Sequence, residues 1–346
     1  MAELKTHHLS PITYHLSRTV KISILDDYQN AIRGLKAFSR LAGHDVAVWN
    51  DHTKDTDQLA ERLKDTEALV LIRERTPIRA PLIERLPKLK LISQSSVYPH
   101  IDLDACTRRG IVLCSDMHPG EPSYATAELA WGLIICALRS IPQEIVALKS
   151  GRWQSTIGTV LRGKTLGIFG YGRIGGVLAR YARAFEMKTL AWGRQRSAER
   201  ARAEGVEYAG SKEALFEQSD VLTLHVRLTP ETRGLVSAAD LARMKPGSLI
   251  VNTSRAGLIE PGALAAALNA GRPGLAAVDV YEEEPLLNPD YPLLKMNNAV
   301  CTPHLGYVAI DGYERIFGTA FDQILAFAAG KPFNVINPEA LKKRES

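Results

Sequence analysis

The fold is decided by residues 164–175, which read KTLGIFGYGRIG. Residues 166–169 form a mostly apolar run typical of a buried strand, and apolar residues recur at helical intervals over 174–185. Between the two lie three glycines with the spacing Gly-x-Gly-x-x-Gly, namely Gly170, Gly172 and Gly175. A strand, these glycines and a helix, in that order, predict a dinucleotide-binding turn with the pyrophosphate on the helix N-terminus. The alternative is a glycine-rich turn in an unrelated α/β protein.

Length, charge and hydropathy predict a two-domain protein that binds neither nucleic acid nor a membrane. The chain has 346 residues, enough for two domains with separate cores. Its net charge is +5, but the basic residues are scattered, and the one basic run, residues 342–344, suits a solvated terminus better than a nucleic-acid site. The longest apolar run, residues 129–138, is too short to cross a bilayer. We therefore expect neither a nucleic-acid partner nor a membrane partner.

The cysteines and histidines predict no metal site. Four cysteines are widely separated, without a Cys-x-x-Cys pair, which is typical of buried thiols in a reducing compartment. Residues 1–18 are polar and lack the apolar core of a signal peptide, so we expect a cytoplasmic protein. The histidines of this segment suit a loose tail better than metal ligands, and they are His7, His8 and His15.

Two series of strands alternating with helices make up the rest of the pattern. The first series lacks a glycine fingerprint, includes a helix expected over 31–39, and has expected strands at 20–25, 45–49, 68–72, 89–92 and 111–114. The second follows the glycine turn, with expected strands at 189–192, 221–225, 248–252, 275–280 and 299–302. Each series predicts an open parallel sheet covered by helices.

The last expected helix, residues 308–329, follows the complete second sheet and should return to the first domain. We expect an α/β protein of two doubly wound parallel-sheet domains, a flavodoxin-like substrate domain and a Rossmann cofactor domain, with a cleft between them. The expected division is a tail over 1–19, a discontinuous substrate/catalytic domain over 20–122 plus 308–335, and a dinucleotide-binding Rossmann domain over 123–307.

Three ionisable side chains follow strands of the second series, namely Arg255, Glu284 and His304. Ligands of open α/β sheets bind at the carboxyl ends of the strands. An arginine can hold a carboxylate in a bidentate fork, and a histidine beside a carboxylate can pass a proton near neutral pH. Next to a nicotinamide, this set could reduce a 2-oxo acid. Taken singly, the arginine could form a surface ion pair, the glutamate could be solvated, and the histidine could be a loop residue with satisfied hydrogen bonds.

Four segments carry a resemblance to a known family: VNTSRAG at 251–257, AVDVYEEEP at 277–285, TPHLG at 302–306 and LHVRLTPETRG at 224–234. Through them the chain resembles the D-isomer-specific 2-hydroxyacid dehydrogenases over about residues 20–332. The resemblance implies that Arg255 anchors the substrate carboxylate and carbonyl, that His304 is the acid/base, and that Glu284 is its partner.

The resemblance also implies a set of cofactor contacts and a homodimer formed through the nucleotide domains. Arg173 and Ile174 would meet the pyrophosphate through backbone amides, and Asp279 would hold the nicotinamide carboxamide. The residues implied to line the cofactor are Val226, Thr253 and Ser254.

The substrate loop departs from the family pattern. It reads SSVYPH at 95–100, shorter and with fewer glycines than is usual, and Ser96 and Val97 are the residues expected to meet the substrate. Tyr98 and His100 could reshape the pocket, although a structural role suits His100 better. The identity of the 2-hydroxy acid and the physiological direction stay open.

Two arginines have open roles. Arg227 replaces a proline usual in the family, and it could touch the cofactor or face solvent. Arg75 could add a positive group at the cleft, or form a salt bridge with Glu74 or another neighbour.

The strand at 189–192 predicts the cofactor preference. NAD-preferring members place a carboxylate after this strand to bind the ribose hydroxyls. Here residues 193–197 read GRQRS, so Arg194 and Arg196 could pair with a 2′-phosphate and Ser197 could hydrogen-bond to it. We expect NADP(H) to be favoured over NAD(H). The alternative is that the arginines stack on adenine.

Two other functions are compatible with the same residues. Formate or phosphite oxidation occurs within the family, but formate enzymes carry an amide where Glu284 stands, which argues against formate. A nucleotide-sensing scaffold, similar to the corepressors among the relatives, would keep the same three residues. Turnover of 2-oxo acids separates the enzyme from the scaffold.

Overall fold

The computed structural model describes residues 19–117 and 124–343. The chain forms two compact units: Met1–Pro119 with Ile310–Ser346, and Gly120–Ala309. We name them the first unit and the second unit. The N-terminal histidines, Arg344 and the expected domain boundary at 122–123 lie outside the described residues.

The first unit is a parallel sheet with the strand order β2-β1-β3-β4-β5. Its strands are β1 (Lys21–Ile24), β2 (Asp45–Val48), β3 (Ala68–Val70), β4 (Leu91–Gln94) and β5 (Val112–Ser115). Its helices are α1 (Thr56–Leu63), α2 (Ala80–Ile83), α3 (Leu103–Arg108), α11 (Ile310–Ala328) and α12 (Glu339–Lys342). This order is that of flavodoxin-like sheets and confirms the fold expected for this part of the chain.

Helix α11 packs on the sheet of the first unit although it comes almost 200 residues after β5. The hydroxyl of Ser93, in the centre of β4, donates to Gln323 Oε1 at 2.6 Å and to the carbonyl of Ala320 at 2.8 Å. All three groups are buried, so these bonds satisfy polar atoms that would otherwise be costly inside the core.

The helix expected over 31–39 is wrong. The segment forms two short 3₁₀ helices, η1 (Ile32–Gly34) and η2 (Lys36–Leu41). Leu35 between them has extended backbone angles, φ −70° and ψ 141°, which interrupts the helical hydrogen bonding. Gly34 immediately before it lowers the helix propensity of the segment.

The second unit is a parallel sheet with the strand order β12-β11-β10-β9-β6-β7-β8. Its strands are β6 (Thr165–Phe169), β7 (Lys188–Trp192), β8 (Glu207–Tyr208), β9 (Val221–Leu224), β10 (Leu249–Asn252), β11 (Leu275–Val278) and β12 (Ala299–Cys301). The order reverses between β6 and β9, which is the switch point of a Rossmann sheet and confirms that expectation.

Helices cover both faces of this sheet and enclose a core on each face. They are α4 (Tyr124–Leu138), α6 (Arg173–Ala184), α7 (Gln195–Ala203), α8 (Lys212–Gln218), α9 (Ala238–Arg243) and α10 (Ala263–Asn269), and a further helix, α5 (Ile141–Lys149), packs against α4 rather than on the sheet. Three 3₁₀ segments lie in the loops: η3 (Pro230–Thr232), η4 (Ala256–Leu258) and η5 (Pro292–Lys295). One face packs α4 and α6 on the sheet, and the other packs α8, α9 and α10.

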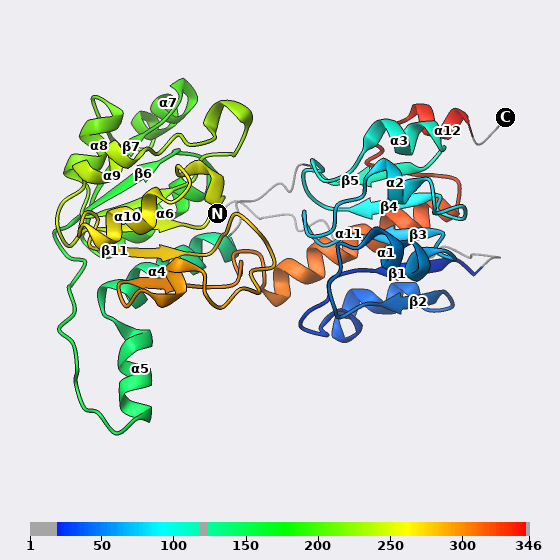
Figure 1. Ribbon diagram of the computed structural model, residues 1–346. Coiled ribbons are helices and arrows are strands. Elements are labelled where there is room, and N and C mark those ends of the chain that lie inside the picture. Colours follow the sequence, from blue (N-terminus) through cyan, green and yellow to red (C-terminus); the bar gives the residue numbers. More distant parts are fainter. Residues whose placement is uncertain (1–18, 118–123, 344–346) are drawn as a thin grey trace, which may run out of the picture. The chain divides into compact units, whose positions relative to one another are not determined.

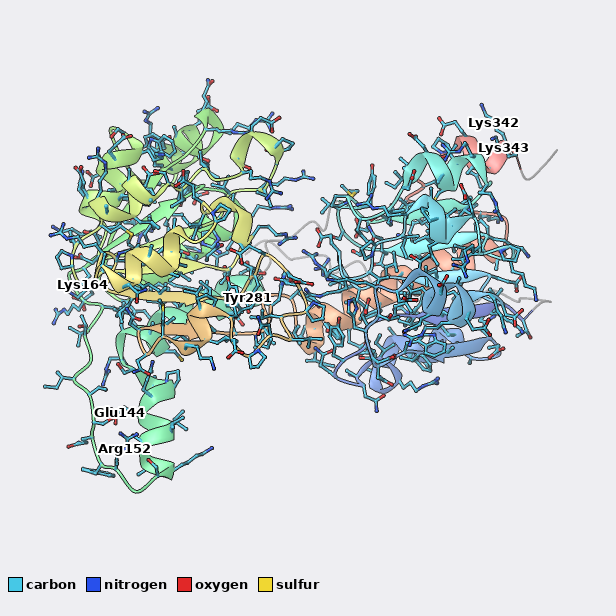
Figure 2. The ribbon with its side chains drawn as sticks, in the orientation of Figure 1. Glu144, Arg152, Lys164, Tyr281, Lys342 and Lys343 are labelled. Carbon is cyan, nitrogen blue, oxygen red and sulfur yellow. The ribbon has the colours of Figure 1, made fainter. Side chains whose placement is uncertain are left out.

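Helix α5 and the loop after it extend from the body of the second unit (Figure 1). Glu144, labelled in Figure 2, ties this loop to the helix because its carboxylate accepts hydrogen bonds from the hydroxyls of Ser155 and Thr156. In the described residues no single helix is long and apolar enough to cross a bilayer, and only the bent pair of α4 and α5 passes such a test by length and composition.

Candidate active site

The glycine turn has the geometry that a dinucleotide requires. Gly170 has φ +94°, and a Cβ there would lie 2.7 Å from the carbonyl oxygen of His225. A Cβ at Gly175 would lie 2.9 Å from the Ile168 side chain, so α6 can approach β6 only without one. A Cβ at Gly172 would meet nothing within 4 Å, and this open space adjoins the N-terminus of α6. The turn therefore fits a pyrophosphate held by the first amides of the helix.

The predicted catalytic residues follow three neighbouring strands. Arg255, Glu284 and His304 come after β10, β11 and β12, which are adjacent in the sheet. Because all three strands are parallel, their carboxyl ends share one edge. Each side chain is only partly buried, so none is sealed in the core.

The structure brings Glu284 and His304 into direct contact. His304 Nδ1 lies 2.6 Å from Glu284 Oε2, and the side chains are 12% and 18% exposed. The other carboxylate oxygen, Oε1, accepts the backbone N–H of Tyr281 at 3.0 Å. With both oxygens of Glu284 engaged, the imidazole is held at Nδ1, and Nε2 is the ring atom able to reach a reacting group.

Arg255 is held through its backbone and its neighbours. Its carbonyl accepts the side-chain amide of Asn252 at 3.0 Å, and its Nη1 donates to the carbonyl of Ser254 at 2.7 Å. The hydroxyl of Ser254 in turn donates to the carbonyl of Leu224 at the end of β9. These bonds fix the loop that leads from β10 into η4.

Asp279 fixes the histidine loop. Its carboxylate accepts the Thr302 hydroxyl at 2.7 Å, the Leu305 N–H at 2.7 Å and the Gly306 N–H at 2.9 Å. These amides follow His304, whose backbone has φ 53°, a left-handed conformation that costs a non-glycine residue about 1–2 kcal/mol. Asp279 is fully buried, and burial raises the pKa of its carboxyl group. The sequence resemblance did not indicate this anchoring role.

The segment expected to bind the adenosine ribose of the cofactor is the positively charged N-terminus of helix α7. Arg194 is the N-cap of α7, and Arg196 and Ser197 lie in its first turn, with both arginines exposed. Gly193 is clamped by Tyr208, whose hydroxyl donates to the Gly193 carbonyl at 2.6 Å and accepts its N–H at 3.0 Å. Tyr208 belongs to β8, a two-residue strand that the sequence pattern did not predict.

Thr253 and Val226, which are implied to line the cofactor, have different surroundings. The hydroxyl of Thr253 is buried and has no hydrogen-bond partner among the described residues, as expected for a group that meets a bound ligand. Val226 is partly buried against the core next to Gly170, where it closes the side of the turn.

The candidate substrate loop lies in the first unit, after β4. The Ser96 carbonyl accepts the Ser115 hydroxyl at 2.6 Å, and the Val97 carbonyl accepts Gln94 Nε2 at 3.2 Å. These bonds hold the loop through its carbonyl groups, and the Ser96 N–H also donates to the Ser115 hydroxyl oxygen at 3.3 Å. A substrate carboxylate that binds the loop amides would share or replace this last bond.

Other polar groups of the first unit are buried near this loop. His100 is 5% exposed, its ring nitrogens have no partner among the described residues, and burial lowers its pKa to about 4. Asp26 accepts the hydroxyl of Thr76 at 2.7 Å and pairs with Nδ1 of His52 at 2.8 Å. Sequence reasoning missed the Asp26–His52 contact because the two residues follow different strands and no motif marks them.

A Rossmann sheet with this glycine turn, and a histidine–glutamate contact at the ends of its strands, is the arrangement expected of a dinucleotide-dependent dehydrogenase. Residues 131–306 match the family described as D-isomer specific 2-hydroxyacid dehydrogenase, NAD binding domain. The chain belongs to this family, which confirms the resemblance seen in the sequence.

Three similar proteins illustrate the match. A glyoxylate reductase from Aeropyrum pernix is 36% identical over 315 residues, which cover 87% of this chain and 92% of that protein. A crystal structure from Ralstonia solanacearum, provisionally described as a D-3-phosphoglycerate dehydrogenase oxidoreductase, is 51% identical with a TM-score of 0.90 and covers 93% of this chain and 98% of that chain. A phosphoglycerate oxidoreductase from Vibrio cholerae is 48% identical with a TM-score of 0.86, covering 90% and 100%.

The family places the chain among the oxidoreductases, as a D-2-hydroxyacid dehydrogenase or 2-oxoacid reductase with a nicotinamide cofactor. These relatives are enzymes, so the corepressor-like alternative is not favoured.

Proposed function

We propose that the protein interconverts a 2-oxo acid and a D-2-hydroxy acid, with His304 as the acid/base, Glu284 as its partner and Arg255 binding the substrate carboxylate. This assignment rests on the 2.6 Å contact between His304 Nδ1 and Glu284 Oε2. The contact lies at the carboxyl ends of the strands, where Arg255 follows the neighbouring strand β10. The second unit would bind the cofactor, and the first would offer Ser96 and Val97 to the substrate.

The residues of the chain perform the proton chemistry and the positioning. The nicotinamide, when bound, supplies or accepts the hydride. Glu284 holds Nδ1 of His304, so Nε2 would give its proton to the carbonyl oxygen of the substrate, and the reaction would consume one proton per 2-oxo acid reduced. The guanidinium of Arg255 pairs with the carboxylate and orients the carbonyl. The amides of Arg173 and Ile174 would hold the pyrophosphate.

The names of the relatives indicate the first substrates to test. We propose the pairs 3-phosphohydroxypyruvate/3-phosphoglycerate and glyoxylate/glycolate, because two structures about half identical to this chain carry the first assignment and an archaeal relative carries the second. Steady-state rates with these acids, hydroxypyruvate and pyruvate test the proposal. An enzyme inactive with every one of them, although it binds the cofactor, would refute it.

For the cofactor we propose a preference for NADP(H) over NAD(H). The exposed guanidinium groups of Arg194 and Arg196 stand where a carboxylate would otherwise repel a 2′-phosphate. We expect Arg194→Ala combined with Arg196→Ala to lower kcat/KM for NADPH by about 10–100-fold and to change that for NADH by less than about threefold. The measurement is kcat/KM with each cofactor at saturating 2-oxo acid.

A matched control for this prediction is Arg162→Ala, which removes an exposed arginine paired with Glu186 before the start of β6. This variant should leave kcat/KM unchanged for both NADPH and NADH. Equal losses with NADPH and NADH in the double variant would mean that the arginines stack on adenine, and a wild-type preference for NADH would contradict the proposal outright.

We also propose a homodimer formed through α5 and the loop that follows it. The apolar side chains there are strongly exposed in the single chain, Trp153 at 77% and Ile157 at 99%. Monomers seldom expose such a group of apolar residues on a projecting segment, which is typical of an interface.

Charges placed on this segment should separate the subunits. We expect Trp153→Glu with Ile157→Glu to convert the dimer into a monomer of about half the mass by light scattering coupled to size-exclusion chromatography, since two carboxylates would be buried unpaired. Leu287→Glu, at an 82% exposed position elsewhere in the same unit, is the control and should stay dimeric. A wild-type monomer, or a dimer that survives the double change, would refute this interface.

A further inference from the structure

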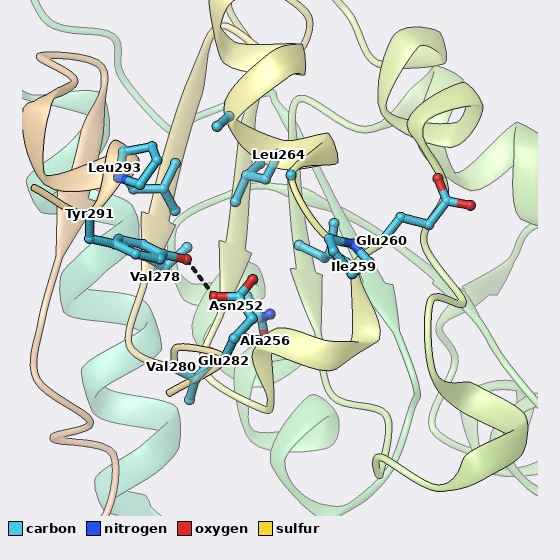
Figure 3. Close-up of a pocket in the computed structure, with 14 residues that line it drawn as sticks. Asn252, Ala256, Ile259, Glu260, Leu264, Val278, Val280, Glu282, Tyr291 and Leu293 are labelled. Carbon is cyan, nitrogen blue, oxygen red and sulfur yellow. Dashed lines mark hydrogen bonds between the residues drawn. The ribbon is translucent and has the colours of Figure 1, made fainter. Parts of the chain in front are cut away.

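The second unit contains a pocket that the proposed reaction does not use (Figure 3). Its volume is about 280 Å³, and it lies between the ends of β10 and β11, the start of α10 and η5. Its floor is apolar, formed by Ile259, Leu264, Val278 and Leu293. Arg255, Glu284 and His304 are not among the residues that line it, so it is distinct from the catalytic side chains.

The charged group directed at this pocket is the Glu282 carboxylate. Figure 3 shows the Tyr291 hydroxyl directed at Glu282, and its oxygen donates to Glu282 Oε2 at 2.6 Å. Glu260 also belongs to the lining, but its side chain turns away from the pocket and its carboxylate accepts the Ala238 N–H at 2.8 Å. The lining contains no lysine, arginine or histidine. An exposed carboxylate above an apolar floor disfavours anionic ligands and suits a ligand with an apolar body and a cationic, hydrogen-bond-donating head.

Residues in the wall of the pocket are connected by direct contacts to the loops that carry Arg255, Glu284 and His304. Asn252 lines it and holds the carbonyl of Arg255. Tyr291 packs edge-on against Tyr281 with ring centroids 5.5 Å apart. Tyr281 in turn donates its N–H to Glu284 Oε1 and its hydroxyl to the carbonyl of Thr302, in the histidine loop. Tyr281 therefore links Tyr291 to the loops that carry Glu284 and His304.

We propose that this pocket is an effector site for a small amine with an aromatic or branched apolar body. The ammonium group takes the place of the Tyr291 hydroxyl on Glu282, and the apolar body fills the floor. Displacement of Tyr291 loosens Tyr281, which disturbs the His304–Glu284 contact and lowers kcat. The binding step is independent of the proposed function, and only the effect on turnover rests on it.

Benzylamine is the probe, with the full chain and ligand-observed NMR as the binding measurement. We expect saturable binding with a Kd of the order of 1 mM, appropriate to a ligand of this size. Benzoate, with the same ring and a negative head, should not bind. Glu282→Gln should weaken benzylamine at least about fivefold, whereas Tyr291→Phe should strengthen it because Glu282 then has no hydroxyl to give up.

Two alanines of α10 provide a matched pair of variants. Ala265→Phe fills the pocket and should abolish binding, while Ala266→Phe, one residue along and not part of the lining, should leave binding intact. Binding that is absent in the wild type, or unchanged in Ala265→Phe, overturns the site. If Ala265→Phe blocks binding but saturating benzylamine leaves the kcat of the wild type unchanged, the effector role is overturned. An enzyme with no 2-oxoacid turnover still reports on the site through NMR, so failure of the function and failure of the pocket are distinguishable.

Discussion

Replacing His304 with glutamine should lower kcat by about 10²–10⁴-fold while the cofactor still binds with nearly unchanged affinity. The loss follows because the amide can keep a hydrogen bond to Glu284 but its N–H protons are not acidic enough to be transferred to the carbonyl oxygen. Steady-state kinetics give kcat, and quenching of protein fluorescence gives cofactor affinity. Because His304 lies in a loop pinned by Asp279, the substitution should leave the fold intact.

The control for this prediction is Glu284→Gln, which keeps the imidazole and changes only its partner. The kcat of Glu284→Gln should be about ten times that of His304→Gln, since its histidine can still transfer a proton. Retention of more than a tenth of wild-type kcat in His304→Gln would remove this residue from the acid/base role.

Replacing Arg255 with lysine should lower kcat/KM for the 2-oxo acid by about 10²–10³-fold. A lysine ammonium keeps the charge but loses the planar fork that binds a carboxylate through two hydrogen bonds, and it cannot orient the carbonyl at the same time. Because that contact strengthens as the reaction proceeds, kcat should fall together with a rise of KM. The measurement is the pair of constants for each acid of the panel.

Arg243→Lys is the matched control, since Arg243 forms an exposed pair with Glu217 on the same unit. Exposed ion pairs contribute little, so this variant should behave as the wild type. If Arg255→Lys retained wild-type kcat/KM, the substrate carboxylate would have to bind elsewhere.

Every strand except β8 was predictable, because parallel strands buried in a sheet are short, mostly apolar runs. The elements that were not predicted lack such a signal. Helix α7 reads QRSAERARA, with only alanines to face the core, and β8 has two residues at the edge of the sheet. The helix expected over 31–39 failed for a local reason, the extended backbone of Leu35 after Gly34.

For the candidate site, the sequence indicated which residues matter but not how they are held. Glu284 and His304 follow adjacent strands, so their proximity could be argued from topology. The three hydrogen bonds to Asp279, the clamp of Tyr208 on Gly193 and the packing of Tyr281 on Tyr291 could not. Each depends on loop conformations and on side-chain directions that the spacing of residues does not determine.

We propose that the chain catalyses hydride transfer to C2 of a 2-oxo acid and that His304 protonates the carbonyl oxygen. The most direct test supplies NADPH deuterated at the transferred position of its nicotinamide, together with whichever of 3-phosphohydroxypyruvate, hydroxypyruvate and pyruvate turns over fastest, since each gives a product with a stereocentre at C2, and analyses the product by NMR and chiral chromatography. From this proposal we expect a D-2-hydroxy acid carrying one deuterium at C2, and almost none of it with His304→Gln. Formation of the L isomer, or of a product without deuterium at C2, would contradict it.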